Sequence, residues 1–170
     1  KSFVEDKIEG YENLADEYIT KPFDEQLLLV KISNILKNRQ NLREYFKNFL
    51  LSPKSLTKKH NVGETEDKFI QQIKDIVQNN FADESFNTIS LAKLILINRS
   101  HLSNKFISLT GETLSNYIRN YRISQAFDLI QQTKAVSVSD LAYKVGFKNA
   151  FHFSRCFKAK FGKPPSEYLL

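Results

Sequence analysis

Two stretches of the chain place hydrogen-bonding and planar side chains at matching positions, about fifty residues apart. They are NRSHLSNKFISLTG, Asn98–Gly111, and NAFHFSRCFKAKFG, Asn149–Gly162. Residues two, three and six positions beyond the first Asn share one side of a helix, because each residue turns a helix by about 100°. We call these sets the first outward face (Ser100, His101, Asn104) and the second outward face (Phe151, His152, Arg155).

Side chains of these types can recognise base edges in the major groove of DNA. Arg suits guanine, Asn suits adenine, Ser bonds to either, and an apolar group contacts the thymine methyl. Ser103 and Ser154, five positions beyond the first Asn, lie at the border of each face. Cations that flank the faces are suited to phosphates. They are Arg99, Lys105, Lys148, Lys158 and Lys160.

Both stretches also carry the marks of a helix. An Asn precedes each one as an N-cap, and a Gly stands just beyond its C-terminus. Apolar residues recur four positions apart on the side opposite the outward face, which predicts that they are buried. These core residues are Leu102 and Phe106 in the first stretch and Phe153 and Phe157 in the second.

A short helix is expected before each stretch. The first begins at Ser90 and continues through Ile95, and the second is opened by a capping box at Ser137–Asp140 and runs through Val145. Each unit is therefore a helix-turn-helix. A helix of about 20 residues, Thr113–Gln132, joins the units and is roughly 30 Å long, close to the 34 Å that separates adjacent major grooves on one side of a duplex.

Charge supports a polyanionic partner. The chain of 170 residues has a net charge of +6, and residues 98–170 hold 11 Lys and Arg against 4 Asp and Glu. A basic segment of this kind favours nucleic acid. One alternative remains, in which the basic helices form a protein-interaction module without specific DNA recognition.

Other classes of function find little support. The acidic residues show no pairing for acid–base catalysis and no glycine-rich phosphate loop occurs, so we expect neither an enzyme nor a cofactor site. His101 and His152 lie in separate helices, so we expect no metal site. A second rival is an enzyme that uses Cys156 on DNA, which requires a reactive, exposed thiol. The single Cys and the lack of a ~20-residue apolar run indicate a cytoplasmic protein without membrane contact.

The N-terminal part has a different pattern. We predict a helix over Phe3–Leu14, a short strand EYIT, and a second helix that follows Pro22 and is capped by Asp24. The sequence predicts three parts, namely residues 1–39, a helical extension and linker over 40–65, and an all-α domain over 66–170 with an apolar stripe from Phe69 to Val77. The absence of Met leads us to expect a piece of a longer protein.

From ISLAKLILINRSHLSNKF to the end, the chain resembles the AraC/XylS family of bacterial transcription regulators. The most specific motif is GF-x-N…F-x-R-x-FK-x-x-FG-x-x-P-S-x-Y, which is complete from Gly146 to Tyr168. The resemblance implies two helix-turn-helix subdomains on a long connecting helix and binding to double-stranded DNA. Asn104 stands where some members have Arg. The positions that contact bases in the family are here Ser100, Ser103, Asn104, Ala150, Phe151, His152 and Arg155.

The segment LADEYITKPFDEQLLLVKISNILKNR resembles the end of a response-regulator receiver domain. In that family the lysine equivalent to Lys21 contacts a phosphorylated aspartate, and Pro22 follows in a cis peptide. The aspartate lies on earlier strands that this chain lacks, so Lys21 has no partner of that kind here. The resemblance implies a two-component regulator, whose full-length form would dimerise on phosphorylation. RNA polymerase is a further candidate partner.

Overall fold

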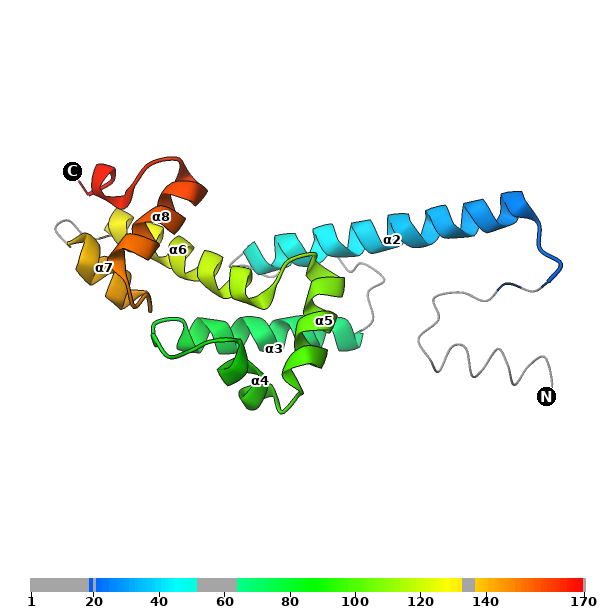
Figure 1. Ribbon diagram of the computed structural model, residues 1–170, viewed down its shortest axis with the longest axis horizontal. Coiled ribbons are helices and arrows are strands. Elements are labelled where there is room, and N and C mark those ends of the chain that lie inside the picture. The colour runs from blue at the N-terminus through cyan, green and yellow to red at the C-terminus, as the bar shows by residue number, and fades with distance from the viewer. Residues whose placement is uncertain (1–18, 20, 52–63, 133–136, 170) are drawn as a thin grey trace. The chain divides into compact units, whose positions relative to one another are not determined.

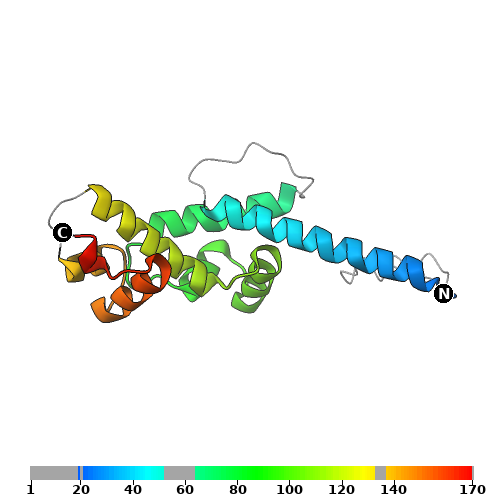
Figure 2. The same cartoon turned by 90° about the horizontal axis from the view of Figure 1, so that it is seen from above.

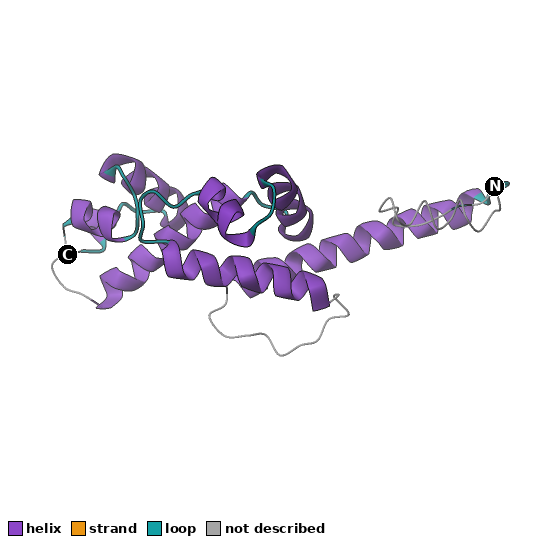
Figure 3. Ribbon diagram, turned by 90° about the horizontal axis from the view of Figure 1, so that it is seen from below, coloured by secondary structure: helices purple, strands orange, loops and turns teal. Residues whose placement is uncertain are grey.

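We describe a computed structural model of the chain, which places residues 19, 21–51, 64–132 and 137–169. The chain divides into two units, Lys1–Tyr45 and Phe46–Leu170, and each is described by itself. The described residues form helices and contain no strand (Figures 1 and 3). The expected helix Phe3–Leu14 lies outside the described residues, as does the expected strand EYIT except for Ile19, which is in neither a helix nor a strand.

Helix α2, Glu25–Leu51, follows Pro22 and starts with the predicted cap, because Asp24 Oδ1 accepts a hydrogen bond from Leu27 N at 2.9 Å. The Lys21–Pro22 peptide bond is cis, and the side chain of Lys21 is exposed. The helix continues without interruption past residue 39, where the sequence predicts the first domain boundary. Its last residues, from Phe46 onward, belong to the second unit, in which Phe46 and Leu50 are buried.

In the second unit, α3 (Glu64–Asn80) and the first helix pair share a core. The predicted stripe of α3 is confirmed, since Phe69, Ile70, Ile73 and Val77 are all buried. Helix α4, Thr88–Ile95, packs against α3 and against α5, Arg99–Thr110. The start of α4 differs from the prediction of Ser90, because Asn87 Oδ1 accepts from both Ile89 N and Ser90 N and caps the helix two residues earlier.

Helix α5 begins and ends as predicted. Asn98 Oδ1 accepts from Ser100 N at 2.9 Å, and Gly111 closes the helix with a φ of 77° and a hydrogen bond from its N–H to the carbonyl of Ile107. The turn between α4 and α5 places Leu96 in the left-handed region, with φ 61°. Its side chain is therefore turned outward and is 92% exposed.

The second helix pair repeats this construction. Helix α7, Val138–Lys144, is capped by Ser137, whose Oγ accepts from Asp140 N at 3.0 Å; Val145, the predicted last residue, is its C-cap. Helix α8, Ala150–Phe161, is capped by Asn149, which accepts from His152 N at 2.9 Å. The short 3-10 helix η1, Pro165–Glu167, then returns the chain to α8.

Helix α6, Leu114–Gln132, joins the two pairs, which lie at its opposite ends (Figures 1 and 2). Its 19 residues span about 28 Å. Near its start, Tyr117 packs against Phe106 of α5, with ring centroids 5.6 Å apart. Near its end, Ile123, Ala126 and Ile130 enter the core of the second pair. The helix thus contributes to two cores on different sides of its surface.

The second core consists largely of aromatic rings. Phe127 of α6 stacks on Phe161 of α8, with centroids 4.5 Å apart, and Phe153 and Phe157 are fully buried. Tyr168 closes this cluster and donates its hydroxyl hydrogen to the carbonyl of Phe161 at 3.2 Å. The terminal PPSEY segment therefore completes the core of the second pair.

An arginine of α6 fixes the junction of the two helix pairs. Arg122 Nε donates to the carbonyl of Phe81 at 2.8 Å, and Nη2 donates to the carbonyls of Asp83 and Phe86 at 2.7 and 3.0 Å. Desolvation by burial lowers the pKa of this guanidinium below its usual range. The turn of the second pair closes over the same place, because a Cβ on Gly146 would meet the Phe81 carbonyl and, at 2.9 Å, Arg122 Nε.

This junction predicts different costs for two glycine substitutions. Gly146 and Gly162 have nearly equal φ angles of 80° and 83°, so replacement by Ala brings similar backbone strain, about 1–2 kcal/mol, at each. Only Gly146 has atoms within 4 Å of its ideal Cβ. We expect Gly146→Ala to lower the free energy of unfolding by roughly 1–3 kcal/mol more than Gly162→Ala, as measured by urea denaturation. Equal losses would contradict the tight junction.

Candidate nucleic-acid interface

The first outward face lies on α5, with its backbone fixed by the Asn98 cap. Ser100, His101 and Asn104 are all exposed, while Ser103 is half-buried at the border of the face. Leu102 and Phe106 are fully buried on the opposite side of the same helix. The periodicity therefore separated the exposed and buried sides of α5 correctly.

The second outward face lies on α8. Phe151 is 78% exposed, His152 and Arg155 are exposed, and Ala150 is half-buried. The His152 ring lies against Phe147, with centroids 5.7 Å apart, which restricts the motion of the imidazole. Phe151 thus presents an exposed aromatic ring on the second outward face.

The five flanking cations have different surroundings. Four of them, Arg99, Lys148, Lys158 and Lys160, are exposed, and Lys105 is half-buried. Lys105 Nζ lies over the ring of Phe69, 4.6 Å from its centroid. Lys160 is directed to α6, where its Nζ donates to the carbonyl of Asn120 at 2.9 Å and to Ser124 Oγ at 2.6 Å, and desolvation lowers its pKa.

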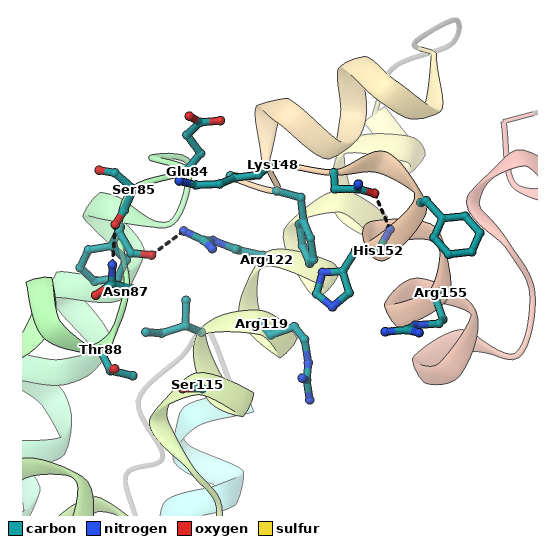
Figure 4. Close-up of a pocket in the computed structure, with 16 residues that line it drawn as sticks. Glu84, Ser85, Asn87, Thr88, Ser115, Arg119, Arg122, Lys148, His152 and Arg155 are labelled. Carbon is teal, nitrogen blue, oxygen red and sulfur yellow. Dashed lines mark hydrogen bonds between the residues drawn. The ribbon is translucent and has the colours of Figure 1, made fainter. Parts of the chain in front are cut away.

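A hollow of about 640 Å³ opens between the two helix pairs (Figure 4). Its lining comes from α6, from the loop between α3 and α4, and from the turn and first half of α8. Sequence reasoning missed several of its polar residues. They include Thr88 at the start of α4, Ser115 and Arg119 on α6, and Glu84 and Ser85 in the loop.

The spacing of three residues along α6 shows that they lie on the same side of the helix. Ser115, Arg119 and Arg122 recur at intervals of four and three, so they share one side of the helix. Nothing in the sequence alone states that this side faces the gap between the helix pairs. That fact depends on how α6 packs into both cores.

Positive charge predominates around the hollow. Its lining includes four cationic side chains, of Arg119, Arg122, Lys148 and Arg155, and one carboxylate, that of Glu84. Nearby Asp83 accepts hydrogen bonds from the backbone N–H and the hydroxyl of Ser85, which lower its pKa. The hollow is therefore suited to an anionic ligand.

The described residues also bear on the expectations for metal ligands, the single thiol and membrane spans. No three His, Cys, Asp or Glu side chains there gather closely enough to hold a metal ion. Cys156 Sγ lies 3.5 Å from His152 Nε2 and is half-buried beneath the second outward face. Among the described helices, none has the length and apolarity needed to cross a membrane.

Comparison with known proteins agrees with this geometry. Residues 91–170 match the family model described as a helix-turn-helix domain. The transcriptional activator RhrA of Rhizobium meliloti is 35% identical over 105 residues, which are 61% of this chain and 33% of that protein.

A longer match extends over the N-terminal unit. Histidine kinase P4 of Formosa agariphila is 34% identical over 163 residues, or 95% of this chain. The chain spans only 12% of that protein and a third of RhrA. The relatives are thus much longer than the sequence described.

Solved structures share the fold of the second unit. A transcriptional regulator of Chromobacterium violaceum, titled as containing an AraC-type DNA-binding domain, matches with a TM-score of 0.56 and 24% identity over 62% of this chain and 92% of its own. The DNA-binding domain of AdpA, solved with a target DNA, matches with a TM-score of 0.53 and 23% identity over 59% of this chain and 88% of its own. These likenesses confirm the all-α fold predicted for this part.

Two phenylalanines on α8 provide a test of the exposed face. Phe151→Ala removes a side chain that is 78% exposed, so we expect a change in unfolding free energy within about 0.5 kcal/mol. Phe153→Ala leaves a cavity at a fully buried site and is expected to cost about 3–5 kcal/mol. Thermal and urea unfolding measure both. A comparable loss in the two variants would mean that Phe151 packs within the fold.

Proposed function

We propose that the second unit binds double-stranded DNA sequence-specifically and thereby regulates transcription, with α5 and α8 in two adjacent major grooves. The observation that carries this proposal is the pair of exposed faces, each opposite a buried phenylalanine core and fixed by an Asn cap. The Rhizobium relative that is named a transcriptional activator supports it, as does the similar domain solved with DNA.

The length of α6 supports the use of two grooves by one chain. Adjacent major grooves on one side of a duplex lie about 34 Å apart, and α6 separates the helix pairs by about 28 Å along its axis. A single domain of this form covers both half-sites of an asymmetric sequence. A second copy of the chain is not required to contact these two half-sites.

Residue roles in the proposal follow from hydrogen-bonding capacity. Asn104 can form two hydrogen bonds with adenine, and Arg155 can do the same with guanine. Phe151 offers an apolar contact for a thymine methyl, while Ser100, Ser103, Ala150 and His152 complete the base-contacting set. The proposed phosphate contacts flank the two faces, and they are Arg99, Lys105, Lys148, Lys158 and Lys160.

We further propose that this unit is the output end of a two-component regulator. The resemblance of residues 1–39 to the end of a receiver domain supports this role. So does the match of nearly the whole chain to a segment of a much larger protein named a histidine kinase. In such a protein, signal-dependent dimerisation would place two of these domains on one operator.

The proposal predicts separate effects of two substitutions on binding. Randomised duplexes are selected over several rounds, and binding is then measured by fluorescence anisotropy. We expect a site with two half-sites about one helical turn apart. Arg155→Ala should relax one half-site and Asn104→Ala the other, each by about 1–3 kcal/mol at the base concerned.

Each variant serves as the control for the other, because both residues are exposed and lie on different helices. If both variants bind every sequence as the wild type does, and the wild type selects no sequence, specific DNA binding is wrong. Binding to an acidic protein surface without salt-dependent DNA affinity would then favour the protein-interaction alternative.

A further inference from the structure

We propose that the hollow between the helix pairs receives the sugar–phosphate backbone of the DNA between the two half-sites, and that Arg119 is its phosphate ligand. This inference rests on the proposed function. Arg119 lies on α6, outside both outward faces, and the sequence motifs give it no role. Its side of α6 is the side that lines the hollow (Figure 4).

Arg119 is positioned to hold an anion. Its Nη2 donates to Asn116 Oδ1 at 2.8 Å, which restricts the half-buried side chain. A guanidinium has five N–H donors, so most of its donors remain for a ligand. Arg122, three residues further along α6, differs, because its donors are directed to the three backbone carbonyls at the junction.

The charge around Arg119 is not balanced by acids. Arg119 and Arg155 both line the large hollow and also a second hollow of about 350 Å³, between α6 and α8. The residues that line this second hollow, all of them described, include Lys160 and no carboxylate. Two guanidinium groups that share their surroundings repel one another, and a bound polyanion removes that repulsion.

The geometry of the duplex indicates which part of the DNA reaches Arg119. When two helices occupy adjacent major grooves, the minor groove and its two backbones face the protein between them. Helix α6 spans this interval, and the hollow lies alongside it. A phosphate of this intervening segment is thus the anion that comes nearest to Arg119, and such a contact is independent of base sequence.

The test uses the selected duplex with single methylphosphonate substitutions, which remove the charge of one phosphate at a time. We expect one position between the half-sites to weaken wild-type binding roughly tenfold, as loss of a charge-assisted hydrogen bond does. Arg119→Ala should weaken binding to the unmodified duplex equally, show no further loss at that position, and reduce the salt slope by about 0.9.

Two control variants accompany this test. Arg119→Lys keeps the charge and should retain most of the salt slope. Lys163→Ala removes an exposed cation that is paired with Glu167 at 3.6 Å and lies outside the hollow. It should therefore leave the affinity unchanged, and the methylphosphonate should weaken its binding as much as it weakens that of the wild type.

The outcomes separate this inference from the proposed function. If the wild type selects a two-part site but no methylphosphonate between the half-sites weakens binding, the phosphate contact is wrong and specific binding stands. The same conclusion follows if a methylphosphonate weakens binding of Arg119→Ala as much as it weakens binding of the wild type. If Arg119→Ala changes the preferred bases between the half-sites, Arg119 contacts the bases instead. Even if Arg119→Ala folds poorly, the series on wild-type protein overturns the inference when no methylphosphonate between the half-sites weakens binding.

Discussion

The hydrogen bonds of Arg122 are the interaction on which the arrangement of the second unit depends. One guanidinium on α6 binds three carbonyls around the loop that leads into the first helix pair, and Gly146 of the second pair's turn lies against the same group. A larger residue than Gly at this turn would separate the pairs. Because each outward face is fixed within its own pair, the rigidity of this junction sets the distance and direction between the two faces.

Local features of the fold were predictable because they depend on neighbouring residues. The caps at Asn98, Ser137 and Asn149 each use a side chain that bonds to an amide two or three residues later, so the sequence alone indicates them. The burial of Phe106 and Phe153 follows from periodicity in the same way. Helix α4 was placed two residues late, because the cap at Asn87 precedes the first apolar residue of the stripe.

Features that depend on tertiary packing could not be predicted. Lys160 and Lys105 are predicted phosphate contacts because they flank an outward face, but the sequence does not reveal that one ammonium bonds to α6 and that the other lies over a ring of α3. The sequence likewise gives Arg119 no role, since its exposure toward the hollow arises only when α6 enters two cores. The sequence predicts a helical extension from residue 40, and the structure shows residues 40–51 as a direct continuation of the preceding helix.

Changing the spacing between half-sites tests most directly the claim that one rigid chain spans two adjacent grooves. The selected site is lengthened by 5 and by 10 base pairs between its halves, and affinity is measured for each duplex. The account predicts that both insertions reduce binding to that of a single half-site, because α6 cannot lengthen by the 34 Å of a full turn. Binding that recovers at 10 base pairs would mean that the pairs are flexibly tethered, and would contradict the rigid junction at Arg122 and Gly146.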